Sequence, residues 1–173
     1  MVPELDLKKS TLKLRDLEKA KRSFTKKDFV SGNLLFLTYD AKNKDMIYDR
    51  RPMILILRFS RTHTLGLNFH WLPYKKRIEL IKEILKENEL RIKEGKKLRF
   101  NYIKLKPFLK RNSYIPCVRV YINKRIFKSG VVIPPERLIE VARIKTESFS
   151  GMSSHQLFRM MKNGSKRFRL HTK

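Results

Sequence analysis

Three apolar runs between residues 33 and 72 constrain the fold of this chain more than any other feature. They read NLLFLTYDA, PMILILRFS and TLGLNFHWL, and each is bounded by polar or charged residues. Runs of this length, rich in aliphatic and aromatic residues, favour β-strands, and short polar connections favour antiparallel pairing between neighbours. The sequence therefore predicts a three-stranded meander at the centre of the fold.

The two connections within this meander differ in length. Residues 41–51 (AKNKDMIYDRR) form a long, charged loop, and such loops in small barrels frequently carry binding contacts. The second connection, around Arg61, Thr62 and His63, is a tight polar turn. Pro73 then ends the third run and begins a helix, because the N–H that proline lacks would be unpaired at that position.

The middle of the chain alternates between helical and strand-like patterns. Residues 74–96 place Ile and Leu at helical spacing before Gly95, which predicts a helix. Residues 117–127 (CVRVYINKRIF) predict a second helix, although their β-branched residues also suit a strand. The runs VVIPP and LIEVARI are strand-like, and they would complete a five-stranded barrel or sheet with the meander.

Both ends of the chain carry basic segments. Residues 8–30 predict an amphipathic basic helix, either an arm that orders on a partner or a segment packed on the domain, with Thr25 as the cap of a last turn. Ser153 would cap a final helix, HQLFRMMKN, docked in part by Leu157. We expect a basic N-terminal arm or helix over 1–30, a single α+β domain over 31–151, and a C-terminal helix and basic tail over 152–173. The predicted fold is a small SH3-like β-barrel or a curved antiparallel sheet, with flanking basic helices and extended termini.

The charge of the chain restricts its partners. Forty-two Lys and Arg residues against 16 Asp and Glu give a net charge of +26, spread along the whole length. The most basic blocks are residues 74–112, with 14 bases and 5 acids, and residues 152–173, with 6 bases and no acid. A free globule with this charge repels itself, so a polyanionic partner is expected.

One acid-free stretch, residues 98–111, interleaves Phe100, Tyr102 and Phe108 with bases. Such a pattern suits a surface where bases hold phosphates and rings stack on nucleobases. The alternative interpretation is that the rings anchor the core while the bases are solvated. The candidate residues for binding nucleic acid or another anion are Lys96, Lys97, Arg99, Lys104, Lys106, Lys110, Arg111, Lys166, Arg167 and Arg169.

The sequence predicts no catalytic residue, no metal site and no cofactor. None of the four histidines has a spacing typical of a metal pair or a nucleophile partner, and His70 is interpreted as a structural hydrogen-bonder. Asp40, Asp45 and Asp49 cluster around the long loop and are candidate metal ligands. The neighbouring Lys and Arg residues offset the negative charge that a divalent ion requires, so salt bridges are favoured. Cys117 is the only cysteine, which excludes an intramolecular disulfide. No apolar stretch approaches the roughly 18 residues of a membrane span.

Two resemblances follow from particular residues. Gly32 to Ile56, a glycine-initiated strand, a charged loop and Arg51-Pro52 before an apolar strand, resembles the opening of small-barrel endoribonuclease toxins of the MazF type. That resemblance implies an RNA-holding role for Arg51. It covers about 25 residues, and the rest of the family's pattern has no clear counterpart, so it supports a small barrel more than a nuclease.

The second resemblance is more extensive. Tyr48-Asp49-Arg50 with Pro52, then the run 66–73 (GLNFHWLP) and Arg77, resemble a group of small basic proteins of tailed bacteriophages. Those proteins share a Tyr-Asp-x-x-Pro step, a Gly-Leu-Asn-x-His-aromatic-Leu strand and a following helix with an arginine. Met46-Ile47 departs from the Leu-Pro of the relatives. The resemblance implies a virion-associated protein, in some cases a DNA end protector, and supplies no catalytic residues.

The leading hypothesis is a non-enzymatic structural protein of a tailed-phage virion, made in the host cytoplasm and present in several copies at the portal, neck or baseplate. It would contact DNA without sequence preference, acidic phage proteins, or both. The alternatives are an RNA-associated protein of the ribosomal type and a small-barrel endoribonuclease. The candidate partner-binding residues are Tyr48, Arg50, Arg51, Asn68, His70 and Trp71.

Overall fold

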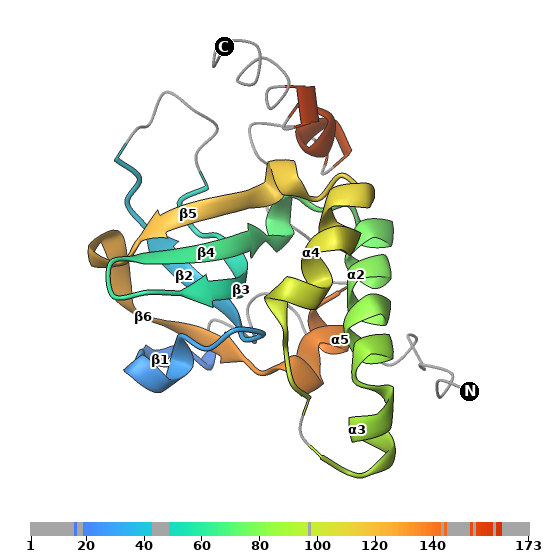
Figure 1. Ribbon diagram of the computed structural model, residues 1–173. Coiled ribbons are helices and arrows are strands. Elements are labelled where there is room, and N and C mark those ends of the chain that lie inside the picture. The colour runs from blue at the N-terminus through green and yellow to red at the C-terminus, as the bar shows by residue number, and fades with distance from the viewer. Residues whose placement is uncertain are drawn as a thin grey trace.

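The computed structural model describes residues 16, 19–42, 49–96, 98–142, 144, 153, 155–160 and 162–163. Within them, one antiparallel sheet has the strand order β1-β6-β2-β3-β4-β5 (Figure 1). The strands are β1 (Arg22–Ser23), β2 (Leu34–Tyr39), β3 (Met53–Phe59), β4 (His63–Asn68), β5 (Val118–Ile122) and β6 (Ile126–Ile133). The predicted meander is confirmed as β2, β3 and β4.

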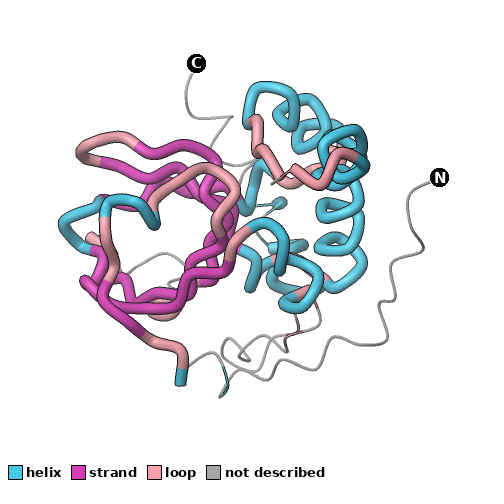
Figure 2. Tube along the Cα trace, turned by 90° about the horizontal axis from the view of Figure 1, so that it is seen from below, coloured by secondary structure: helices cyan, strands magenta, loops and turns pink. Residues whose placement is uncertain are grey.

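The sheet is open but strongly curved. Its strands bend around a common interior on one side of the molecule (Figure 2). The register shifts between Leu37 and Tyr39 on β2 and between Ile56 and Arg58 on β3, and such bulges bend a strand and increase its twist. The α+β class with a curved antiparallel sheet is therefore confirmed, and β1 and β5 remain as separate edges instead of closing a barrel.

The helices lie together against one face of the sheet (Figures 1 and 2). They are α2 (Tyr74–Glu87), α3 (Glu89–Lys93), α4 (Tyr102–Arg111) and α5 (Leu138–Val141). Leu55 of β3 belongs to the core on the helical side, whereas its neighbour Ile54 belongs to a second core on the other side. Because successive side chains of a strand point to opposite faces, two covered faces explain why the run PMILILRFS is continuously apolar.

The predicted helix over 74–96 is confirmed with one interruption. Pro73 occupies the N-cap position of α2, and Gly95 follows α3 with φ +65°, a left-handed conformation that glycine adopts without strain. Asn88 separates α2 from α3. Its Nδ2 donates to Ile84 O at 2.8 Å and its Oδ1 accepts from the backbone N–H of Arg99 at 2.7 Å, so it also anchors the segment that leads to α4.

Two predictions in the second half of the chain are wrong. Residues 118–127 form β5, a 3-10 turn over Asn123–Arg125 and the start of β6 instead of a helix, and Cys117 ends the 3-10 turn before β5. Their β-branched residues suit a strand, and Tyr121 fills the second core. The run LIEVARI contributes α5 instead of a strand, because Pro134-Pro135 opens a turn of helix whose Leu138 and Val141 reach the core.

The N-terminal prediction is wrong for residues 22–30. Arg22 and Ser23 pair with Gly130 and Ser129 of β6, and Lys26–Asp28 form a 3-10 turn. Thr25 does cap that turn, as predicted, in a reciprocal capping box with Asp28. Most of residues 8–18 lies outside the described residues.

The predicted C-terminal helix is confirmed over residues 155–160. The Ser153 Oγ accepts from Gln156 N at 3.3 Å, Ser153 N donates to Gln156 Oε1 at 2.8 Å, and Leu157 is buried. Met161, the other residue expected to dock this helix, and the basic tail lie outside the described residues. No helix in the described part of the chain has both the length and the apolar character needed to cross a membrane.

Candidate nucleic-acid interface

Helix α4 presents the basic surface expected from the acid-free stretch. Leu105 and Leu109 face the core, four residues apart, and the bases around them in the sequence are exposed. Asn101 caps the helix by accepting from the N–H of Ile103 at 3.0 Å. We call the exposed bases of this segment the α4 surface, which comprises Arg99, Lys104, Lys106, Lys110 and Arg111.

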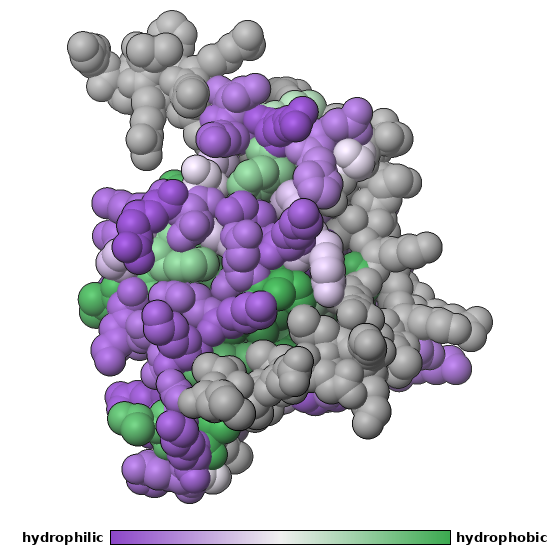
Figure 3. Space-filling model, turned by 90° about the vertical axis from the view of Figure 1, so that its right-hand side faces the viewer, coloured by the Kyte–Doolittle hydropathy of each residue, from purple (hydrophilic) through white to green (hydrophobic). Residues whose placement is uncertain are grey.

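The α4 surface belongs to the helical side of the molecule, over which hydrophilic residues predominate (Figure 3). Lys110 and Arg111 occupy the last turn of α4, where cations interact favourably with the helix dipole. Lys96, the neighbouring candidate, instead pairs with Glu94 at 2.9 Å. Lys97, Lys166, Arg167 and Arg169 lie outside the described residues.

The aromatic residues of this stretch serve the fold. Phe100, Tyr102 and Phe108 pack as partly buried rings against the core on the helical side. The ring of Phe108 stacks on that of Tyr114, with centroids 5.5 Å apart and planes inclined by 30°. The interpretation as core anchors is therefore confirmed, and the α4 surface offers charge without rings for base stacking.

The candidate partner-binding residues divide into two groups. Arg50 and Arg51 are exposed just before β3, and Tyr48 lies outside the described residues. Asn68, His70 and Trp71 are buried at the end of β4 and in the turn that follows. Their side chains therefore have roles inside the protein, whereas the sequence predicts that they contact a partner.

A buried carboxylate explains the placement of Asn68 and His70. Asp49 is only 6% exposed, and its Oδ2 accepts from Asn68 Nδ2 at 2.8 Å and from His70 Nδ1 at 3.1 Å. Its Oδ1 accepts from the backbone N–H of Arg51 at 3.0 Å. Because a carboxylate oxygen accepts hydrogen bonds, Nδ1 of His70 is the donor in this contact. This network joins the end of the long loop to the end of β4, and the structural interpretation of His70 is confirmed.

The other loop carboxylates have different surroundings. Asp40 pairs with Arg125 at 3.3 Å on the surface, and Asp45 lies outside the described residues. No group of three or more His, Cys, Asp or Glu side chains with the geometry of a metal site occurs in the part of the chain that the structure describes.

Trp71 and Arg119 form a contact that the sequence does not reveal. The guanidinium carbon of Arg119, on β5, lies 5.0 Å from the centroid of the Trp71 ring, a cation–π distance. Burial lowers the pKa of Arg119 from its usual value. Because the sequence predicts a helix over 117–127, it does not indicate this contact between β5 and the turn after β4.

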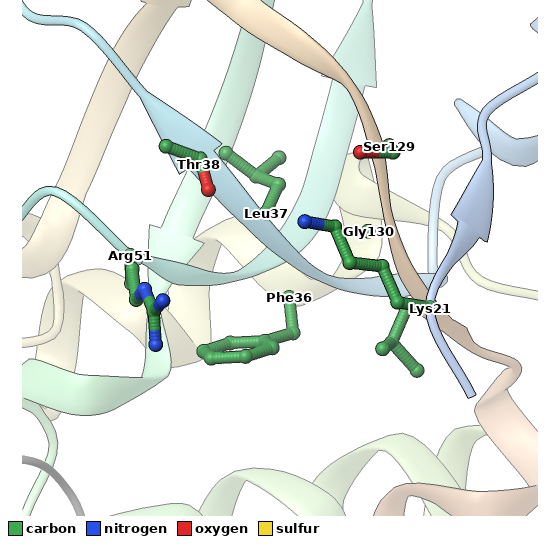
Figure 4. Close-up of a pocket in the computed structure, with 8 residues that line it drawn as sticks. Lys21, Phe36, Leu37, Thr38, Arg51, Ser129 and Gly130 are labelled. Atoms are coloured by element: carbon green, nitrogen blue, oxygen red, sulfur yellow. The ribbon is translucent and has the colours of Figure 1, made fainter. Parts of the chain in front are cut away.

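Two further cationic side chains line a small cavity. It has a volume of about 50 Å³ and lies beside Phe36, with Lys21 and Arg51 on either side of that ring (Figure 4). The cavity is far smaller than the roughly 300 Å³ at which ligand pockets begin. Lys21 reaches it because residues after 20 turn onto β6 instead of continuing a helix.

A comparison with protein-family models identifies the family of the chain. The family model described as Phage T4 terminal DNA protecting protein matches residues 8–163, a span that includes every strand and helix named above. No curated protein and no solved structure matches the chain significantly. The family match confirms the expected relationship to tailed-phage proteins. Because it spans far more than half of the sequence, this chain belongs to the family of the Phage T4 terminal DNA protecting protein.

Proposed function

We propose that this protein is a non-enzymatic component of a tailed-phage virion that binds the ends of the phage DNA and shields them. The observation that carries the proposal is the acid-free, exposed α4 surface in a member of a family described as DNA protecting. Several copies would act where DNA ends meet the portal, neck or baseplate, after synthesis in the host cytoplasm.

The α4 surface suits contact with the DNA backbone. Four of its five bases are exposed on a helix anchored by Leu105 and Leu109, so their stems project from a fixed support, and Arg99 precedes that helix. Lysines and arginines that meet phosphates release condensed counterions, which gives affinity without sequence readout. The net charge of +26 adds long-range attraction of any polyanion to the protein.

The surroundings of Asp49 support a structural role over cleavage of nucleic acid. A nuclease mechanism through the 41–51 loop would use Asp49 and Arg51. The Asp49 carboxylate, however, accepts hydrogen bonds from three groups of the protein itself and is buried. Its oxygens therefore serve the protein's internal network, and binding alone is the proposed activity.

The salt dependence of DNA binding tests the role of α4. We propose to measure the affinity for a short labelled duplex by fluorescence anisotropy between about 50 and 200 mM salt. The test variant replaces Lys104, Lys106 and Lys110 by Gln. The matched control replaces three exposed lysines of α2 by Gln, namely Lys75, Lys82 and Lys86.

Both variants remove the same charge from a helix surface, so only the location of that charge differs. The slope of log K against log salt should become shallower by about 0.9 for each phosphate that the α4 variant no longer neutralises. The α2 control should keep a slope close to that of the wild type. Equal slopes in the two variants would exclude α4 as the DNA-binding surface.

A further inference from the structure

A second, aromatic surface lies at the open end of the curved sheet, away from α4. It is a groove of about 440 Å³, a volume within the range of about 300–1,000 Å³ that is typical of ligand pockets. Three segments that are distant in sequence line it, namely residues 23–29, the end of β3 with the turn that follows it, and residues 123–128.

Four phenylalanines dominate this groove: Phe24, Phe29, Phe59 and Phe127. The Phe24 and Phe29 rings meet edge to face with centroids 5.5 Å apart, and Phe59 lies 5.3 Å from Phe29 at an interplanar angle of 33°. Phe59 is 39% exposed and Phe127 is 55% exposed. Phe24 and Phe29 therefore pack against the second core, whereas Phe59 and Phe127 leave aromatic surface available for a ligand.

The rim of the groove is cationic. Lys26, Arg61 and Lys128 are exposed lining residues, and none of the described residues that line the groove carries a carboxylate. The nearby Asp28 is buried and held by both terminal nitrogens of Arg22, at 2.6 and 2.9 Å. Its charge is thus neutralised by an ion pair, and the groove presents rings surrounded by positive charge.

Hydrogen bonds hold the groove in shape. The Asn123 side chain donates to the backbone oxygen of Ser60 at 2.8 Å and accepts from Thr64 Oγ1 at 2.7 Å, which ties the turn after β3 to the segment before β6. Phe24 N donates to Lys128 O at 2.7 Å, which ties residues 23–29 to residues 123–128. A rigid groove loses little conformational entropy when a ligand binds.

We infer that this groove stacks an unpaired nucleotide at a DNA end. The inference rests on the proposed function and supplies what the α4 surface lacks. Backbone contacts are the same along a duplex and cannot distinguish its end from its middle. In an intact duplex both faces of each internal base are stacked, so only a terminal or unpaired nucleotide offers a base face to a protein ring. Phe59 and Phe127 would stack on that base, and the cationic rim would contact the adjoining phosphates.

Two duplexes of equal length and charge separate the groove from the α4 surface. One carries a three-nucleotide 3′ overhang containing 2-aminopurine, whose fluorescence reports stacking, and the other has both ends closed by base-free linkers. Binding to the closed duplex measures the backbone contacts. The ratio of the two affinities measures recognition of the unpaired end.

The wild type should prefer the overhang about tenfold, as expected for one stacked base. Phe59→Ala and Phe127→Ala should each reduce this ratio towards one and abolish the change in 2-aminopurine fluorescence on binding. Both variants should leave the affinity for the closed duplex unchanged. Phe127→Tyr should retain the preference. Tyr74→Ala is the matched control, since it removes another exposed aromatic residue outside the groove.

The possible failures are distinct. Absence of any DNA binding by the wild type would overturn the proposed function and the inference together. Normal binding to both duplexes, with a ratio that the groove variants leave unchanged, would overturn the inference alone and leave the proposed function standing. Thermal unfolding of each variant checks that the fold is retained, as the exposure of Phe59 and Phe127 predicts.

Discussion

The buried carboxylate of Asp49 accepts a hydrogen bond from Nδ1 of His70, 21 residues further along the chain, at 3.1 Å. Asn68 completes the arrangement, because it donates to Asp49 through Nδ2 and accepts from the His70 backbone N–H at 2.9 Å. Asp49, Asn68 and His70 lie in the segments on which the predicted resemblance to small phage proteins rests. In the structure they form a junction between the long loop and β4.

Replacement of Asp49 by Ala should destabilise the protein by about 3 kcal/mol, because buried donors of Asn68 and His70 lose their acceptor. Urea unfolding at neutral pH measures the change in unfolding free energy. Asp40→Ala is the control: its pair with Arg125 is partly exposed, so the cost should stay below about 1 kcal/mol. Equal costs for the two variants would contradict a structural role for the Asp49 network.

Arg77 should be essential for joining α2 to the end of α5. Its Nε donates to Leu72 O at 3.0 Å and its Nη1 donates to Ile144 O at 2.8 Å, and the residue is only 3% exposed. Arg77→Met should cost about 3 kcal/mol in unfolding free energy, since buried carbonyls lose their donors. Arg77→Lys should cost less because one donor group remains. A Met variant as stable as the wild type would refute this role.

The Arg22–Asp28 pair should make stability depend on pH. The guanidinium of Arg22 lowers the pKa of Asp28 from 3.8 to about 2. A carboxyl whose pKa is lower in the folded state stabilises the protein above its unfolded pKa, and this contribution disappears as the pH falls through the folded pKa. The stability gap between wild type and Asp28→Asn, measured by urea unfolding, should be constant above about pH 5 and shrink towards pH 2. A gap that does not change over this interval would show that Asp28 is not ion-paired.

Cys117 should be unreactive in the native protein. Burial raises the pKa of its thiol to about 12, and its Sγ lies 3.8 Å from Trp71 O. Because the thiolate is the reactive species, a disulfide reagent at pH 8 should label Cys117 only after the protein unfolds. Rapid labelling of the native chain would mean that the helical-side core is open.

The sequence predicts those elements whose signal is local. The three apolar runs specify β2, β3 and β4, and the spacing of Ile and Leu over 74–96 specifies α2. Pro73, Gly95, Thr25 and Ser153 mark element ends through their own backbone chemistry. The helix predicted over residues 117–127 is wrong because a short apolar run interrupted by a few bases fits a helix or a strand until its partner strand, β4, is known.

The candidate sites depend on contacts between distant residues. Asn68, His70 and Trp71 read as polar or aromatic surface candidates, and only the carboxylate of Asp49 and the packing of β5 make them internal. The aromatic groove is lined by three segments that are distant in sequence. Because a helix is predicted through residue 30, the sequence does not indicate that residues 23–29 line the groove. The exposed bases of α4 were found from sequence because the acid-free composition of residues 98–111 is a local signal, whereas the helix that carries them was not predicted.

The most direct test of DNA-end binding is a protection assay with competition. A labelled linear duplex is mixed with the protein and then digested with a processive exonuclease, in the presence of unlabelled linear or closed circular DNA of equal nucleotide mass. We predict that the protein delays digestion and that linear competitor removes this protection in proportion to its number of ends, whereas closed circles remove it far less. Equal competition by closed circles and linear fragments would contradict end binding and leave only general affinity for polyanions.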